Sequence, residues 1–212
     1  RLRISSIEAS QVTDEVLDVL MGSNKFCRHL HVPLQAGDDT ILKRMRRKYT
    51  VKEYAEKIER IRKRWPEVAI TTDVIVGFPG ETDEMFENGY RFMKEIGFSE
   101  MHVFPYSKRT GTPAARMDDQ VDEAIKNERV HKLIDLSEEM QLAYANRFVG
   151  QVLEVIPERE VKGVEGGRLL SGYTDNYLHV IVPGTTASIG DLVKVRITEA
   201  GVNDCKGELV QE

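Results

Sequence analysis

The chain has 212 residues, of which 31% are charged and 7% aromatic, and its formal net charge is -5. This length allows a substantial core, either in one large domain or in one medium and one small domain, and two domains fit better. No apolar run approaches the ~20 residues that cross a bilayer. The negative balance excludes a protein that coats nucleic acid through net charge alone. Two distant cysteines, Cys27 and Cys205, form no disulfide framework, and the chain opens without a basic, apolar leader, so we expect a cytoplasmic protein.

Strand and helix patterns alternate through the first half of the chain. Strands are predicted over residues 2–7, up to Pro33, over 68–76 and over 100–104. Helices are predicted from Thr13, from Asp38 into the basic run 43–48, over 50–65 behind a capping box, and from about 83 to a cap at Gly97. Four parallel strands with helices between them predict an incomplete barrel or an open α/β sheet. Strand-like residues at the very start lead us to expect more sequence upstream of Arg1.

The pattern changes after Ala115. Residues 121–148 read as one long charged helix that bridges two parts, closed by Gly150. Beyond it, residues 151–156, 169–173, 178–182 and 192–198 alternate in the manner of strands and are separated by glycine-rich turns. Short, evenly spaced strands predict a small antiparallel barrel. We therefore divide the chain into domains at residues 1–145 and 146–212.

Polar loops follow three of the strands. The loop 77–82 contains two glycines, as a phosphate cradle would, but Glu81, Asp83 and Glu84 stand there without a lysine. Such a loop repels phosphate and accepts hydrogen bonds from ammonium groups or ribose hydroxyls, which suits a cationic nucleoside ligand. A plain tight turn, with acids that favour the start of the next helix, explains these residues equally well.

Two histidines lie on the predicted second strand. His29 and His31 are two residues apart and so point to the same face of the sheet. Zinc takes three or four ligands, and no third histidine or cysteine lies at ligand spacing, so we expect hydrogen-bonding roles and no metal. Asp73 stands in an apolar strand, where an acid is costly to bury unless it is paired, and a structural role fits it as well as a functional one.

The loop 106–112 combines an aromatic ring, two cations and hydroxyl groups. A ring at a strand end can stack on adenine, and Arg109 can bind a carboxylate or phosphate through both arms of its guanidinium group. The alternative is a solvated linker. The basic run 43–48 is ordinarily a solvated helix end, and it would matter for RNA if other cations lay on the same side.

Five segments together resemble the radical-SAM methylthiotransferases. They are SSIE at 5–8, HVPLQAG at 31–37, LKRMRRKYT at 42–50, DVIVGFPGET at 73–82 and FPYSKRTGTPA at 104–114. The resemblance spans essentially the whole chain, because the tail from about Gln151 is similar to the small RNA-binding TRAM barrel that ends those enzymes. Residues 5–8 and 107–115 resemble most the branch that adds a methylthio group to threonylcarbamoyladenosine beside the tRNA anticodon.

The resemblance implies a partial radical-SAM (βα) barrel, its last four strands, followed by a TRAM-like barrel. Family members hold one 4Fe-4S cluster on a C-x-x-x-C-x-x-C loop that splits S-adenosylmethionine, and a second that supplies sulfur. Cys27 and Cys205 cannot furnish those ligands, so the resemblance implies the C-terminal portion of such an enzyme, inactive alone. It also implies a set of residues that hold S-adenosylmethionine: Ser6, Glu8, Gln35, Ile75, Gly77, Phe104 and Tyr106.

A tRNA partner requires local cations on an acidic chain. We predict that these are Arg44, Arg46, Arg47 and Lys48, with Lys108 and Arg109, while Tyr173 and Tyr177 of the terminal barrel stack on bases. Two alternatives stay open. One is a methylthiotransferase that acts on isopentenyladenosine in tRNA or on a ribosomal protein, and the other is a tRNA-binding module without catalysis.

Overall fold

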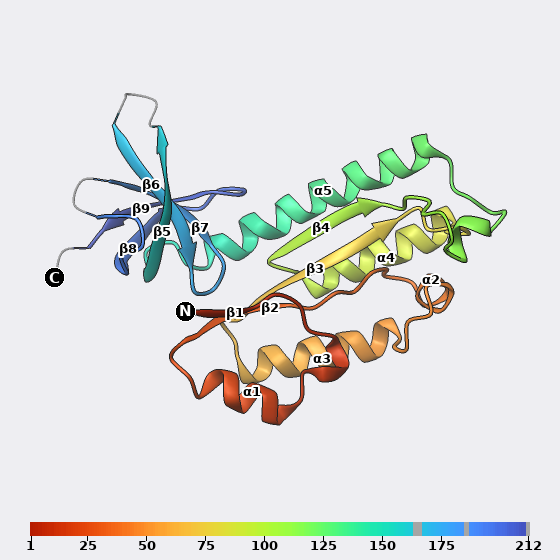
Figure 1. The fold of residues 1–212 in the computed structure, drawn as a ribbon, viewed down its shortest axis with the longest axis horizontal. Helices are drawn as coiled ribbons and strands as arrows, with labels where there is room; N and C mark the ends of the chain where they lie inside the picture. The colour runs from red at the N-terminus through yellow and green to blue at the C-terminus, as the bar shows by residue number, and fades with distance from the viewer. Residues whose placement is uncertain (163–166, 185–186, 211–212) are drawn as a thin grey trace.

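A computed structural model describes residues 1–162, 167–184 and 187–210 of the chain. It contains an α/β part with one parallel sheet, a long helix, and a closed β-barrel at the C-terminal end (Figure 1). No helix among the described residues is long and apolar enough to span a membrane.

The parallel sheet has four strands in the order of the sequence. They are β1 (Leu2–Ile4), β2 (Phe26–His31), β3 (Ala69–Val76) and β4 (Glu100–Pro105). Each pairs in parallel with the next, which confirms the predicted open sheet. The predicted first strand was too long, because β1 ends at Ile4 and the chain then leaves the sheet toward a short 3-10 turn at Ala9–Gln11.

The helices begin where the sequence predicts. They are α1 (Asp14–Met21), α2 (Asp39–Arg44), α3 (Val51–Arg64) and α4 (Asp83–Ile96). Thr50 and Glu53 form the expected capping box, and Gly97 ends α4 with a positive φ of 63°. The helix predicted into the basic run is shorter than expected, because Arg46 adopts a left-handed φ of 59° and residues 45–46 form a turn.

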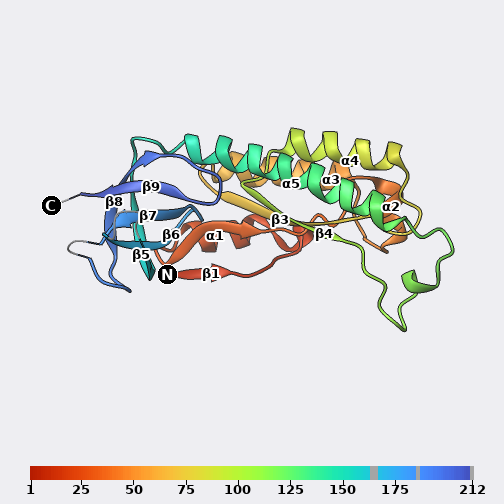
Figure 2. The same ribbon diagram turned by 90° about the horizontal axis from the view of Figure 1, so that it is seen from above.

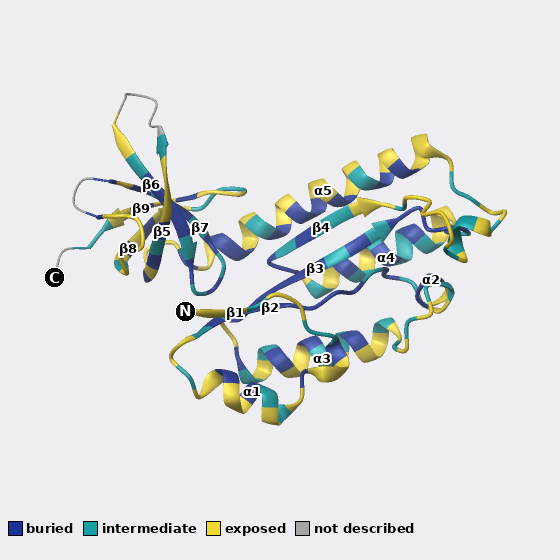
Figure 3. Cartoon of the chain, in the orientation of Figure 1, coloured by how far each residue is buried: buried dark blue, intermediate teal, exposed yellow. Residues whose placement is uncertain are grey.

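The helices lie on one side of the sheet. Leu30, Ile70 and Val74 are almost completely buried in a core that also contains Tyr54 of α3 and Phe86 of α4. Figure 2 shows α3, α4 and α5 on one side of the strands, and Figure 3 shows that their outer surfaces are the exposed ones. Side chains that alternate with this core, such as Asp73, Ile75 and His102, are only partly buried, so we refer to their side as the open face.

The long helix α5 (Glu123–Asn146) completes the covered side. Leu133 and Leu136 enter the core, and the hydroxyl of Ser137 accepts a hydrogen bond from the amide of Met101 on β4 at 2.9 Å. Arg129, buried in α5, forms an ion pair with the buried carboxylate of Glu81 at 2.9 Å. This pair anchors the loop after β3 to α5.

The terminal barrel has five strands, one more than predicted. They are β5 (Val152–Lys162), β6 (Arg168–Thr174), β7 (His179–Pro183), β8 (Val193–Glu199) and β9 (Cys205–Leu209), closed in the order β5-β6-β7-β9-β8. The sequence analysis missed β9, whose short run of cysteine, charged residues and glycine has little strand character. The barrel is antiparallel except where β7 and β9 pair in parallel.

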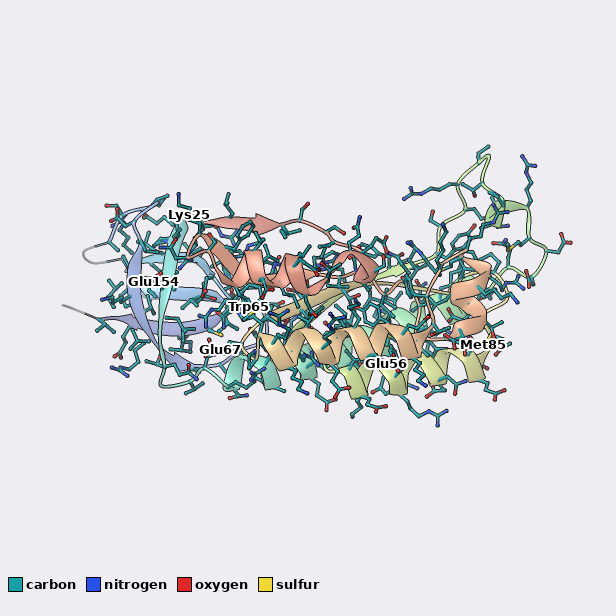
Figure 4. All side chains as sticks on the ribbon, turned by 90° about the horizontal axis from the view of Figure 1, so that it is seen from below. Lys25, Glu56, Trp65, Glu67, Met85 and Glu154 are labelled. Atoms are coloured by element: carbon teal, nitrogen blue, oxygen red, sulfur yellow. The ribbon has the colours of Figure 1, made fainter. Side chains whose placement is uncertain are left out.

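The turn between β6 and β7 docks on the amino ends of the parallel strands. Asp175 receives two hydrogen bonds from Arg28 on β2, at 2.6 and 2.9 Å, and Arg28 also pairs with Glu67. Tyr177 stacks on His29 with ring centroids 4.0 Å apart and planes 9° apart. Figure 4 shows Glu67 and Trp65 at this junction, and Met85 at the opposite end of the sheet domain.

The Glu81–Arg129 pair makes stability depend on pH. Burial raises the pKa of Glu81 to about 7, although Arg129 pulls that pKa downward. A carboxyl group with a raised pKa in the folded state stabilises the fold less as pH rises from its unfolded pKa toward 7. Removing the cation with Arg129→Met raises the pKa of Glu81 further. We therefore expect the variant to lose more unfolding free energy at pH 8 than at pH 5, measured by urea denaturation.

The double variant Glu81→Gln, Arg129→Met is the control. It carries no titratable carboxyl at position 81. The free energy of unfolding that it loses relative to the single variant Glu81→Gln should therefore be the same at pH 5 and pH 8. An equal loss at pH 5 and pH 8 in the single variant Arg129→Met would contradict the assignment.

Candidate functional site

Three of the residues predicted to hold a cofactor meet at the carboxyl edge of the open face. The backbone amide of Gln35 donates a hydrogen bond to the backbone carbonyl of Asp73. The backbone amide of Ile75 donates one to the backbone carbonyl of Gln35, and both bonds are 2.9 Å long. Ile75 on β3 is the register partner of Phe104 on β4. Phe104 is 50% exposed. Gln35, Ile75 and Phe104 thus form one ledge, where an aromatic face is available to a flat ligand.

Ser6 and Glu8 lie at the neighbouring edge, beyond the end of β1. The amide of Ile7 between them donates to the carbonyl of His31 at 3.0 Å, which holds this segment beside β2. Ser6 is exposed, and Glu8 pairs with Arg47 at 3.4 Å. The predicted cofactor residue Glu8 and the predicted RNA-binding residue Arg47 therefore contact each other.

Gly77 and Tyr106 face the helices. A Cβ on Gly77 would lie 2.3 Å from Cγ of Lys126 on α5, and the backbone of Gly77 has a positive φ of 68°. Tyr106 packs edge-on against Phe78, with ring centroids 5.2 Å apart. Its buried hydroxyl has no hydrogen-bond partner among the described residues. Packing against α5 explains why position 77 requires glycine, so the requirement is not by itself a sign of a ligand.

A polar cluster lies deeper on the open face, toward the barrel. His31 of β2 lies 3.3 Å from the carboxylate of Asp73 on β3, measured from Nε2 to Oδ2. Asp73 is the register partner of His102 on β4, and the rings of His31 and His102 have centroids 5.7 Å apart. The sequence analysis missed His102, because register across three strands, not spacing along the chain, brings it to the other two.

Thr71 joins the two histidines of β2. Its Oγ1 lies 2.9 Å from Nδ1 of His31 and 2.9 Å from Nε2 of His29. Burial lowers the pKa of His29 to about 3, so His29 is neutral at physiological pH. These contacts confirm hydrogen-bonding roles for both histidines and fix the orientation of the His31 ring.

The predicted RNA-binding cations divide into two groups. Arg44 pairs with Asp119 at 2.6 Å, and Arg47 pairs with Glu8. The other four are exposed and form no ion pair with any described residue; they are Arg46, Lys48, Lys108 and Arg109. Figure 1 shows α2 and the segment after β4 at the end of the molecule far from the barrel, and in Figure 2 that segment extends away from α3 and α4.

Tyr173 and Tyr177 lie instead at the junction with the barrel. Their rings stack with centroids 5.1 Å apart, and the guanidinium group of Arg3 lies 4.8 Å from the centroid of Tyr177. Both tyrosines line a cavity of about 300 Å³ between the two parts, together with Glu100, Arg159 and His179. Tyr177 also stacks on His29, whereas Tyr173 lies against His179, with ring centroids 4.8 Å apart.

Known proteins match both parts of the chain. Residues 2–93 match the Radical SAM superfamily, and residues 146–210 match the TRAM domain. Among solved structures, coproporphyrinogen III oxidase from Escherichia coli superposes with a TM-score of 0.54 at 15% identity, over 80% of this chain and 45% of that one. That likeness supports the fold of the sheet domain.

Curated relatives match from end to end. The chain is 56% identical to the "Threonylcarbamoyladenosine tRNA methylthiotransferase MtaB" of Bacillus subtilis, over 100% of this chain and 47% of the relative. It is 40% identical to a "tRNA-2-methylthio-N(6)-dimethylallyladenosine synthase" of Carboxydothermus hydrogenoformans, over 99% of this chain and 47% of the relative. The chain spans about half the length of the curated relatives it matches.

The cysteines test whether an iron–sulfur cluster fits these residues. The chain contains two cysteines, Cys27 and Cys205, one in each part and both buried. Three thiolates at C-x-x-x-C-x-x-C spacing are therefore absent from this sequence, so its residues do not fit the cluster. The resemblance inferred from the motifs is confirmed: the whole chain is similar to tRNA methylthiotransferases, and it joins a segment that matches the Radical SAM superfamily to one that matches the TRAM domain.

Proposed function

We propose that this chain is the C-terminal part of a tRNA methylthiotransferase that adds a methylthio group to C2 of N6-threonylcarbamoyladenosine next to the anticodon. The observation that carries the proposal is the 56% identity, over the whole chain, to a relative named for this activity. Relatives named for dimethylallyladenosine match at 40%, which favours the threonylcarbamoyl substrate.

The chain divides into two domains, residues 1–145 and 146–212, and the end of α5 at Asn146 supports this boundary. The protein works in the cytoplasm on tRNA.

The open face serves as the wall of the cosubstrate site. In the complete enzyme, S-adenosylmethionine and one 4Fe-4S cluster would supply the radical chemistry, and a second cluster would supply the sulfur. This chain, with only two cysteines, lacks the ligands for these clusters and is inactive alone. Phe104 and Ile75 contact the adenine, and Gln35 contacts the ribose or methionine part. Ser6 and Glu8 line the adjacent edge. Gly77 and Tyr106 support this wall from the helix side, through contacts with Lys126 and Phe78.

The substrate contacts divide between the two ends of the molecule. Arg46, Lys48, Lys108 and Arg109 bind phosphates at one end, where no carboxylate among the described residues neutralises them. Arg44 and Arg47 join them only if their carboxylate partners Asp119 and Glu8 release them. At the barrel end, Tyr173 offers a stacking surface beside the cavity, and Tyr177 holds it in place.

A chimera tests the activity. Residues 1–212 replace the matching segment of the Bacillus subtilis relative, in cells that lack that enzyme. We expect methylthiolated threonylcarbamoyladenosine to reappear in hydrolysed tRNA, measured by mass spectrometry. The same chimera with the host's cluster cysteines replaced by alanine should give none. Modification of isopentenyladenosine or of a ribosomal protein instead would identify the alternative substrates, and binding of tRNA without any modification would identify a non-catalytic module.

Phe104 tests the cosubstrate wall. In the chimera, Phe104→Ala removes a stacking surface worth about 1–3 kcal/mol, so we expect the dissociation constant for S-adenosylmethionine to rise about tenfold. Because Phe104 is half exposed, its loss should leave the melting temperature nearly unchanged. The control is Leu192→Ala, because Leu192 is an exposed apolar residue of the barrel part, 57% exposed against 50% for Phe104. If both variants bound S-adenosylmethionine with the same affinity, Phe104 would not belong to the cosubstrate site.

Charge reversal tests the phosphate contacts. The double variant Arg46→Glu, Lys48→Glu should weaken tRNA binding and reduce the slope of log affinity against log salt by about 1–2. The matched control is Lys52→Glu, Lys63→Glu, which changes the net charge equally on exposed positions of α3. A loss of the same size in both variants would show that net charge, not this site, governs binding.

A further inference from the structure

The polar cluster on the open face has the composition of a metal site. His31, Asp73 and His102 each offer one ligand atom, and these atoms lie within 4.8 Å of one another. Two imidazoles and one carboxylate form the donor set that suits Zn²⁺, Fe²⁺ or Co²⁺, whereas Mg²⁺ and Ca²⁺ prefer all-oxygen sites. Strand register places Asp73 beside His102, and His31, whose register partner is Thr71, reaches them diagonally from the neighbouring strand β2.

The orientation of His31 fits a ligand. Metal-binding histidines use one ring nitrogen for the metal and hydrogen-bond the other to a neighbouring group. Nδ1 of His31 lies 2.9 Å from the hydroxyl of Thr71, and Nε2 points toward Asp73. Thr71 is 1% exposed, and its contact with Nδ1 orients the His31 ring so that Nε2 lies on the side of the cluster.

Charge and exposure also fit a divalent cation. Asp73 contributes one negative charge, and Glu100 adds another nearby, with its carboxylate 3.8 Å from Nδ1 of His102. The side chains of Asp73 and His102 are 33% and 38% exposed, which leaves an approach for the ion and room for a further ligand. Ligands of a tetrahedral ion lie about 3.3 Å apart, so His102, the most exposed of the three, must move inward.

We propose that His31, Asp73 and His102 bind a divalent transition metal ion, with at least one coordination position open toward the open face. None of its three ligands is a thiolate, so it differs in chemistry from an iron–sulfur site. Its open position faces the same space as Phe104 and Ile75, so an exogenous oxygen or nitrogen ligand can complete it.

Cobalt titration of the 212-residue chain, stripped of metal with EDTA, tests the proposal. We expect one Co²⁺ per chain, with visible d–d absorption of a four- or five-coordinate site, without a thiolate charge-transfer band, and displaced by Zn²⁺ but not by Mg²⁺. Asp73→Asn and His102→Asn should each weaken binding at least tenfold. His131→Asn is the matched control, since His131 is an exposed histidine of α5 outside the cluster, and its affinity should equal that of the parent chain.

Melting curves without metal show whether each variant folds, and the rise in melting temperature on adding Co²⁺ gives a second measure of binding. Saturable binding that persists in His102→Asn, or no one-to-one binding by the parent chain, would overturn the proposal. The measurement involves neither tRNA nor S-adenosylmethionine, so its failure leaves the proposed methylthiotransferase function intact, and failure of the chimera leaves the metal site intact.

Discussion

The feature on which the rest of the structure depends is a parallel sheet covered by helices on one side only. Parallel sheets are normally buried on both faces. Here Leu30, Ile70 and Val74 are buried under the helices, while the alternate positions carry groups that tolerate water or need a partner. The uncovered face is therefore neither a second core nor an ordinary surface. It places His102, Asp73 and the exposed Phe104 where a ligand or another protein segment can cover them.

The docking of the barrel is continuous with this face. Tyr177 stacks on His29, His29 hydrogen-bonds to Thr71, and Thr71 hydrogen-bonds to His31. The same turn brings Asp175 to Arg28, and the side chains of this ion pair are 24% and 25% exposed. Because each contact restricts the next, the position of the TRAM domain and the orientation of His31 are coupled.

Local signals in the sequence predicted most helices and strands. Contacts between segments that are distant in the sequence were harder to predict. The capping box at Thr50 and the glycine at position 97 are local, and both were confirmed. Strand β9 was missed because it forms through closure of the barrel. His102 was missed for a similar reason: strand register, which depends on the packing of the whole sheet, puts it opposite Asp73. The motif at residues 73–82 led to the prediction that Gly77 contacts the cosubstrate, but close packing against Lys126 also explains why this position is a glycine.

The ledge and the polar cluster can be occupied at the same time. Asp73 and Ile75 are two residues apart on β3, and His102 and Phe104 are two apart on β4. Two residues of a strand span about 6.6 Å, so a metal held at the level of Asp73 lies one layer below a ring stacked at the level of Phe104. A ligand that reaches down from the ledge would meet the open coordination position with its polar end. The spacing is thus short enough for one ligand, flat at one end and carrying an oxygen or nitrogen donor at the other, to reach both places.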